Sequence, residues 1–339
     1  MRVVSTWEYK QNLAGISKLT GNDVLHIYDV FDQQYLNWIL TKGNPKYIVN
    51  DHITWFDNIK LYSLPLFIEK QTKFITNGIQ FTNEIKTSNC FNFIINKKEI
   101  NRFLCIKFVE LFKLHNFDYT WSAVDRTFDM NIIIDELNTL TKCVILTPEE
   151  KSFILAPIQL EKRFIEFPGQ KINNSSIGNY GGNAWTWKNG LQDIFLNSAI
   201  SLITETVNYQ RASVFTEKTL YSVLGLTFPI WIGGYNQASE WRRLGFDTFD
   251  DVIDHSYQSY DTLIERCYYA FTRNLSLLSD KNTTKELRLV HKDRLFKNRE
   301  LLLQNHLGKF VDQEISKFPE DLQLAMPEIL KYFRRPLKD

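Results

Sequence analysis

Hydrophobic residues in this chain form short runs that alternate with segments of helical period. Apolar runs at 24–28 and 47–49 flank a helix-like segment at 34–40. Further along the pattern sharpens, with an apolar strand at 90–95, a polar turn, and then a helix over 102–115. Apolar residues in that helix recur every three or four positions, which is the period of a helix with one buried face. A strand, a turn and a helix in this order indicate the start of a βα unit.

The same alternation continues along the rest of the chain. Strands are expected at 143–146, 199–205 and 228–232, and helices at 219–226, 239–244 and 260–274. Strands that alternate with helices predict an α/β fold with a mostly parallel sheet. In such sheets ligands bind at the carboxyl ends of the strands.

Length and pattern together suggest how the chain is divided. With 339 residues it exceeds a usual single domain of ~100–200 residues, so two lobes or one large α/β body are expected. We place a small N-terminal α/β lobe at 1–88, a ligand-binding α/β lobe at 89–275, and C-terminal helices that pack on or bridge the lobes at 276–339. No linker or repeat marks these boundaries, which depend on changes in pattern alone.

Composition and charge narrow the class of protein. Hydrophobic residues make up 44% and charged residues 23%, which is typical of a globular chain and excludes a disordered or fibrous one. Because 40 Lys and Arg residues balance 39 Asp and Glu residues, no bulk field draws the chain to nucleic acid or anionic lipid. The four cysteines lack C-x-x-C spacing, and no apolar stretch has the length of a signal or membrane span. We expect a cytoplasmic protein without a membrane partner.

The segment richest in candidate chemistry follows the strand expected at 199–205. That strand ends in Glu205, whose carboxylate would lie at the rim of the sheet, within reach of ligand hydroxyls. Thr216 is the expected N-cap of the next helix, which would begin with Glu217 and Lys218. Free backbone N–H groups, the helix dipole and the Lys218 ammonium would then meet at one place suited to a phosphate. Glu217 and Lys218 are adjacent, so they are not expected to pair as residues four apart would; a solvated helix start is the alternative interpretation.

Several common catalytic motifs are absent from the sequence. It has no G-x-x-x-x-G-K-[ST] loop and no G-x-G-x-x-G after a strand, so kinase, ATPase and nicotinamide-dependent functions lack their main support. It has no G-x-S-x-G elbow either. The acidic residues Asp247, Asp250, Asp251 and Asp254 raise the question of a bound metal ion. They follow a Gly turn and not an apolar strand, so we expect no metal.

Four ordered blocks, at 201–206, 215–219, 244–249 and 253–257, resemble a known group of enzymes. They are similar to the donor-binding signature of fucosyltransferase-like glycosyltransferases of the GT-B fold, and closer still to phage, giant-virus and bacterial glycosyltransferases. The likeness covers roughly residues 90–275. It implies two Rossmann-like lobes and transfer of a sugar from a nucleotide-diphosphate sugar to a hydroxyl. It also implies no metal and no cofactor beyond this donor, which is a co-substrate.

The resemblance further implies roles for single residues. The donor-binding residues would be Arg102, Glu205, Thr216, Glu217, Lys218 and Thr219. Lys218 would hold the diphosphate, Glu217 the ribose or the sugar hydroxyls, and Glu205 the same loop or the sugar. Arg102 is the second phosphate candidate, because Asn101 stands where relatives have the His of a basic pair.

The catalytic base is expected in the N-terminal lobe, which faces the donor across the cleft in enzymes of this kind. Transfer to a hydroxyl requires a group that takes up a proton near neutral pH. Asp51 and His52 follow the apolar run at 47–49 and are our candidates. Asp29 and Asp32, which follow the preceding apolar run, are the alternatives.

Aromatic and basic residues indicate an acceptor site. Trp185 and Trp187 lie in a loop rich in Gly and Asn and are suited to stack a sugar or a flipped base, and Arg242 is suited to contact phosphate. The likeness to viral enzymes suggests double-stranded DNA with a modified base, such as hydroxymethylcytosine, as acceptor, and the host cytoplasm as location. A glycan or protein hydroxyl is the alternative acceptor. A non-catalytic nucleotide-binding relative and a DNA-binding protein are the two alternative classes.

Overall fold

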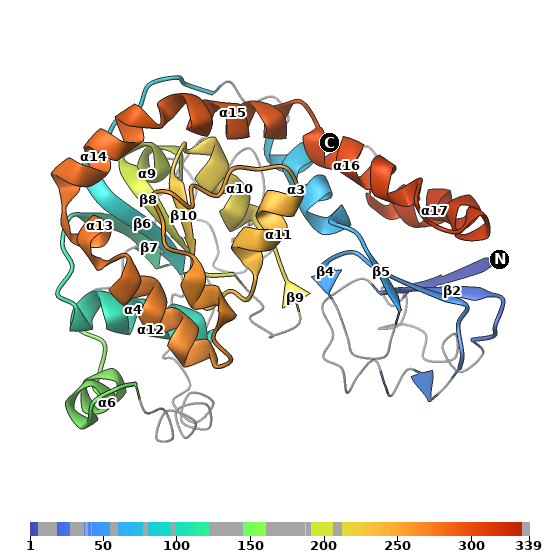
Figure 1. Ribbon diagram of the computed structural model, residues 1–339, viewed down its shortest axis with the longest axis horizontal. Helices are drawn as coiled ribbons and strands as arrows, with labels where there is room; N and C mark the ends of the chain where they lie inside the picture. The colour runs from blue at the N-terminus through green and yellow to red at the C-terminus, as the bar shows by residue number, and fades with distance from the viewer. Residues whose placement is uncertain are drawn as a thin grey trace, which may run out of the picture.

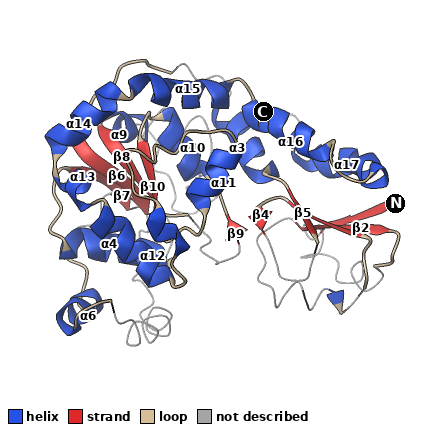
Figure 2. Cartoon of the chain, viewed as in Figure 1, coloured by secondary structure: helices blue, strands red, loops and turns tan. Residues whose placement is uncertain are grey.

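The chain folds into two α/β lobes, each built on a four-stranded sheet of parallel strands, in a computed structural model (Figure 1). The structure describes residues 1–5, 19–27, 37, 40–41, 43–54, 60–76, 81–95, 99–121, 145–160, 187, 191–205 and 212–333. Helices cover the sheets, and a series of C-terminal helices runs along both lobes (Figure 2). The predicted α/β fold, with two Rossmann-like lobes, mostly parallel sheets and C-terminal helices, is confirmed.

The first lobe carries the sheet of order β1-β2-β3-β5. Its strands are β1 (Arg2–Ser5), β2 (Asp23–Ile27), β3 (Tyr47–Asn50) and β5 (Leu61–Ser63). Helix α3 (Leu66–Thr76) follows the sheet, and α16 (His306–Ile315) and α17 (Glu320–Phe333) return from the far end of the chain to pack on it. Val24, Val49, Val311, Leu322 and Ile329 are buried together there. The last helices therefore complete the core of the N-terminal lobe.

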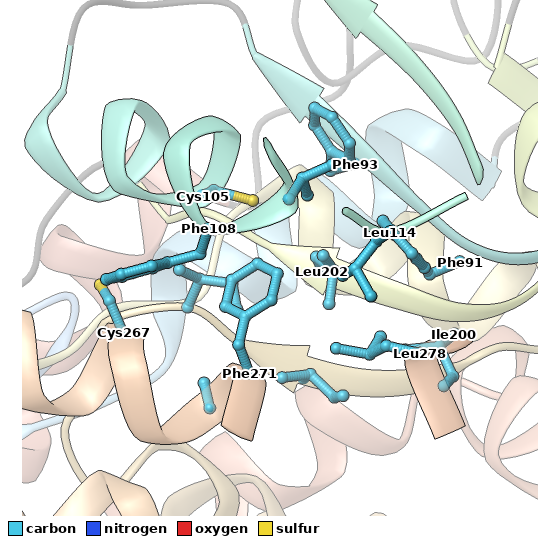
Figure 3. Close-up of a cluster of buried hydrophobic side chains, with 14 of the residues drawn as sticks. Phe91, Phe93, Cys105, Phe108, Leu114, Ile200, Leu202, Cys267, Phe271 and Leu278 are labelled. Carbon is cyan, nitrogen blue, oxygen red and sulfur yellow. The ribbon is translucent and has the colours of Figure 1, made fainter. Parts of the chain in front are cut away.

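The second lobe carries the sheet of order β10-β8-β6-β7. Its strands are β6 (Asn89–Ile95), β7 (Phe117–Trp121), β8 (Ser198–Ile203) and β10 (Phe228–Trp231). On one face α4 (Ile100–Leu111) and α12 (Leu263–Arg273) pack against alternate residues of the central strands, and Phe108 and Phe271 belong to the same buried cluster as Phe91 and Ile200 (Figure 3). The opposite face is covered by α10 (Glu217–Leu224) and α11 (Gln237–Arg243). Burial of both faces explains why these strands read as nearly continuous apolar runs.

The remaining described elements connect these layers. They are β4 (Ile53–Thr54), β9 (Ala212–Ser213), α6 (Pro148–Leu155), α9 (Gln192–Leu196), the 3-10 helix η3 (Ser256–Ser259), α13 (Leu275–Ser279), α14 (Lys281–Val290) and α15 (Lys292–Leu303). Helices α14 and α15 pass along the second lobe before α16 and α17 reach the first (Figure 1). The short strands β4 and β9 come from different lobes and pair with each other.

Two sequence-based assignments differ from the structure. Residues 143–144 of the strand predicted at 143–146 lie outside the described residues, and Ile145 and Leu146 form a turn before α6. The fourth strand of the second sheet is β7, which was not predicted. Its apolar residues alternate with Asp118 and Thr120, a pattern typical of a strand at the edge of a sheet. The helix predicted at 34–40 lies almost entirely outside the described residues.

Arg294 holds the turn that follows α11 to helix α15. Its guanidinium donates to both carboxylate oxygens of Asp247, at 2.6 and 3.0 Å, and to both of Asp251, at 2.7 and 2.9 Å. Burial would raise the pKa of Asp247, but the hydrogen bonds from Arg294 hold it below its usual value, and they also lower the pKa of Asp251.

We predict that Arg294→Ala lowers the free energy of unfolding at pH 7 by about 1 kcal/mol, since partly exposed ion pairs contribute little. Both carboxyl pKa values are depressed in the folded state, so this contribution is present above ~pH 4 and is lost as the pH falls. Urea titrations at pH 7 and pH 3 should therefore show a smaller difference between variant and parent at pH 3 than at pH 7. An equal difference at both pH values would contradict the ion-pair explanation.

Candidate functional site

Glu205 lies just beyond the carboxyl end of β8 and fixes the loop that leads into α10. Its side chain is buried, with Oε1 accepting hydrogen bonds from the Thr216 N–H at 3.0 Å and the Thr219 hydroxyl at 2.7 Å. Oε2 accepts from the Thr216 hydroxyl. Burial raises the pKa of Glu205, although the Lys218 charge and the hydrogen bonds from Thr216 lower it in part. The carboxylate thus holds the loop that leads into α10 by three hydrogen bonds.

The start of α10 has the geometry expected of a capped helix N-terminus. Thr216 is the N-cap, with φ −117° and ψ −173°, and its hydroxyl accepts from the Lys218 N–H at 3.4 Å. The Lys218 ammonium lies 3.0 Å from Glu217 Oε1, so the expectation that these neighbours do not pair is wrong. Side chains on a helix lean toward its N-terminus, and this direction brings the Lys218 ammonium back to Glu217 and to the Thr216 hydroxyl, 3.3 Å away.

Arg102 of α4 adds a second cation to this place. Its side chain is 1% exposed, and burial lowers its pKa, while the nearby charges of Glu99, Glu217 and Glu205 oppose that shift. Burial would raise the pKa of the Glu217 carboxyl. The charge and hydrogen bond of Lys218, and to a smaller extent the charge of Arg102, hold this pKa below its ordinary value. Arg102, Lys218 and Glu205, which are buried, and Glu217, which is partly buried, therefore form one ionic cluster at the carboxyl edge of the second sheet.

Two further side chains support this cluster and were not found from the sequence. The Asn101 amide donates to the Glu205 carbonyl at 3.0 Å and to the Ile232 carbonyl at 3.3 Å, which joins the segments that follow β8 and β10. The Trp231 indole N–H donates to the Thr219 hydroxyl at 3.0 Å. The signal for Asn101 in the sequence was its place directly before Arg102. An amide suits this position because it satisfies two buried carbonyl groups.

Asp51 and His52 follow β3 at the carboxyl edge of the first sheet. Both are buried, and His52 Nε2 lies 3.9 Å from Asp51 Oδ1. The Asp51 carbonyl accepts from the Phe67 N–H at 3.2 Å, in the first turn of α3. One turn later in α3, burial lowers the pKa of Lys70, opposed by the Asp51 charge. Burial lowers the pKa of His52 to about 3, so this imidazole is neutral at physiological pH. The alternative candidates for the base, Asp29 and Asp32, lie outside the described residues.

His26, the residue before the end of β2, makes the first lobe sensitive to acid. It is fully buried, its ring lies 5.7 Å from the Phe333 ring, and burial lowers its pKa to about 4. A histidine pKa depressed by folding means that the unfolded chain binds the proton first, so stability is lost as the pH falls from ~6.5 to 4.

We predict that His26→Gln removes about 2–3 kcal/mol of the stability difference between pH 7 and pH 4.5. The measurement is urea denaturation at both pH values. His115→Gln serves as the control, because His115 is exposed in the loop before β7. An unchanged pH dependence in His26→Gln would show that the buried imidazole does not cause it.

Strands β4 and β9 bring the two halves of the candidate site together. Ile53 pairs with Ser213 and Thr54 with Ala212, in antiparallel orientation. In sequence β4 follows His52 directly, and Ser213 lies three residues before Thr216. The predicted base of the first lobe is therefore linked through one strand pair to the predicted phosphate site of the second (Figure 1).

The residues expected to bind the acceptor are placed differently. Trp187 is fully buried, stacked on Tyr221 at 5.5 Å and packed on Phe195. Its ring is part of the core, which corrects the expectation of an exposed stacking face. Trp185 lies outside the described residues.

Arg242 is exposed and lines an open cavity of about 680 Å³ between α11 and the loop at 250–259. Its guanidinium is ion-paired with Asp250, and Asp251 and Asp254 line the same cavity. The surroundings of Arg242 are therefore acidic and unsuited to following a phosphate backbone.

The described residues contain no group of three or more His, Cys, Asp or Glu side chains placed to hold a metal ion. Among the described helices, none has the length and apolar character needed to cross a membrane. Comparison with protein-family models, with curated proteins and with solved structures finds no match to the chain.

Proposed function

We propose that the chain is a glycosyltransferase that uses a nucleotide-diphosphate sugar as donor. The observation that carries this proposal is the ionic cluster at the start of α10. Two buried cations, Lys218 and Arg102, lie beside the N-terminus of a helix at the carboxyl edge of a parallel sheet. In open α/β sheets this edge is where ligands bind, and a helix N-terminus with a cation suits a diphosphate.

In the proposed reaction the acceptor oxygen attacks the anomeric carbon and the bond from that carbon to the diphosphate oxygen breaks. Negative charge then develops on the leaving diphosphate. The Lys218 ammonium, the Arg102 guanidinium and the α10 dipole stabilise that charge without first having to reorganise. The acceptor proton passes to the Asp51 carboxylate, which the β4–β9 pair links to the donor site.

We further propose that the acceptor is a saccharide hydroxyl in preference to duplex DNA. Arg242 is paired with Asp250, and the cavity beside it is lined by two more aspartates. Carboxylates accept hydrogen bonds from sugar hydroxyls and repel a phosphate backbone. Trp187 is buried and presents no ring to a flipped base.

The test is a panel of UDP-, GDP- and CMP-sugars, each supplied with no acceptor, with oligosaccharides, and with duplex DNA containing hydroxymethylated pyrimidines. Release of nucleoside diphosphate or monophosphate and mass changes of the acceptors are the measurements. The proposal expects turnover of at least one diphosphate donor, with transfer to a saccharide. Transfer to DNA alone would correct the acceptor, and absence of donor binding and turnover across the panel would refute the enzyme.

A further inference from the structure

An antiparallel strand pair, β4 with β9, joins the two lobes at the candidate site, beside the packing of α3 on α10. Its four residues are Ile53 and Thr54 from the first lobe, and Ala212 and Ser213 from the second. The pair is short, but it lies between the two groups on which the proposed transfer depends. Asp51 precedes it by two residues on one strand, and Lys218 follows it by five on the other.

Ser213 is the residue through which this pair is fastened to the second lobe. Besides pairing with Ile53, it is 1% exposed and its hydroxyl donates to the Tyr235 carbonyl at 3.0 Å. The next residue is held as well, because the Gln237 amide donates to the Val214 carbonyl at 2.7 Å. Residues 213–214 are thus tied to the loop after β10 before the chain enters the ionic cluster.

These connections form one continuous path between the lobes. Asn101 joins the segments after β8 and β10, Ser213 joins the latter to β9, and β9 pairs with β4. A displacement of β9 by one residue would move Asp51 by about 3.3 Å relative to the start of α10. Displacements of about 1 Å in reacting groups are enough to lower a rate by a large factor.

We propose that the β4–β9 pair couples the lobes and that Ser213 is its positioning residue. Given the proposed glycosyltransferase function, the pair sets the register of Asp51 against the donor diphosphate and keeps the base over the acceptor hydroxyl. Opening it leaves the donor site intact, because that site is built within the second lobe. Water then replaces the acceptor, and the donor is hydrolysed in place of being transferred.

The test uses proline at each of the two positions in β9. Consecutive N–H groups in an antiparallel strand point to opposite sides, so one of Ala212 and Ser213 directs its N–H to β4. Of Ala212→Pro and Ser213→Pro, one removes the N–H directed to β4 and opens the pair, while the other leaves that N–H in place. Because Ser213→Pro also loses the hydroxyl bond to Tyr235, it is compared with Ser213→Ala, and Ala212→Pro is compared with the parent. Ser213→Ala removes only the bond to Tyr235. Ser198→Ala is the control for this change. Ser198 is also a buried serine, and its hydroxyl donates to the Ile194 carbonyl at 2.8 Å, but it lies at the amino end of β8, away from the ionic cluster.

The first measurement does not depend on activity. Spin labels on Leu324→Cys in α17 and Val290→Cys in α14, both exposed positions, report the separation of the lobes, with Cys143 replaced by Ser. Cys90, Cys105 and Cys267 are buried and can stay. The opened variant is expected to broaden a distance distribution that is narrow in the parent and in the controls. An unchanged distribution in both proline variants would overturn the coupling.

The second measurement is the ratio of sugar transfer to donor hydrolysis. We expect it to fall by about tenfold or more in the opened variant, by less in Ser213→Ala, and not at all in Ser198→Ala, while nucleotide affinity stays within a factor of about three. If the opened variant has the same ratio of transfer to hydrolysis as the parent, the pair does not position the base. If the parent turns over no nucleotide sugar, the proposed function fails, and the distance measurement alone decides whether the pair couples the lobes.

Discussion

Lys218→Met is expected to lower sugar transfer by about 10²- to 10³-fold and to weaken binding of the nucleoside diphosphate product. The ammonium it removes lies at the start of α10, 3.0 Å from Glu217 and beside the N-cap hydroxyl of Thr216. Because it is 5% exposed, its field on a bound diphosphate would be screened little by water. Methionine keeps the length and most of the volume of the side chain, so the change is mainly one of charge.

Controls separate a role in binding from a role in folding. Lys107 is a second buried lysine of this lobe, paired with Glu110 at 2.9 Å and bonded to the Ala156 carbonyl at 3.1 Å. Lys107→Met should cost stability with no change in nucleotide affinity, whereas Lys218→Arg should recover much of the affinity. Isothermal titration with UDP and GDP, with melting temperatures of all variants, makes the comparison. If Lys218→Met binds and turns over as the parent does, the diphosphate is not held by this residue.

Local patterns were enough to predict the first residues of the ionic cluster. Thr216 as N-cap follows from a hydroxyl residue that precedes a helical period, and the position of Glu205 follows from the end of an apolar strand. In a parallel sheet all carboxyl ends meet at one edge, so α4 and α10 both begin there. This rule brings Arg102 and Lys218 into one cluster, although they are far apart in the chain.

The rest of the site depends on contacts that no local pattern encodes. Strands β4 and β9 have two residues each, too few for a period, and β5, β6, β7 and β8 lie between them in sequence. The amide of Asn101 is placed by two carbonyl groups from different loops. Trp187 looked like part of a binding loop because Gly and Asn surround it, yet stacking on Tyr221 places it in the core. Tertiary packing decided each of these positions.

Arg288→Ala is expected to lower the free energy of unfolding by about 3–5 kcal/mol. Arg288 of α14 is fully buried, and its guanidinium donates to the carbonyl groups of Gly225 at 2.7 Å and Leu226 at 2.9 Å, just after α10. It also donates to the Leu196 carbonyl at 2.8 Å, at the end of α9, and to the Lys86 carbonyl at 2.8 Å. Truncation leaves these acceptors buried without a donor, which costs about 1–3 kcal/mol for each that stays unsatisfied.

The measurement is guanidinium chloride unfolding of Arg288→Ala, beside Lys285→Ala on the exposed side of the same helix. Lys285→Ala should lie within about 0.5 kcal/mol of the parent. Arg288→Lys should recover part of the loss, because one ammonium reaches fewer of the carbonyl groups than a planar guanidinium does. A loss below about 1 kcal/mol in Arg288→Ala would show that water or a neighbouring donor replaces the guanidinium.

The position of Arg288 separates this effect from the chemistry. It binds the ends of α9 and α10 and the chain just before β6, so it lies at the amino edge of the second sheet, across from the ionic cluster. Arg288→Ala, kept at a temperature at which it is folded, should therefore bind nucleoside diphosphate within a factor of about two of the parent. Lys218→Met should lose nucleotide affinity in addition to the stability lost when Glu217 is left without its cation. Two buried cations at opposite edges of one sheet would then be assigned different tasks, one to holding helix ends together and the other to holding a ligand.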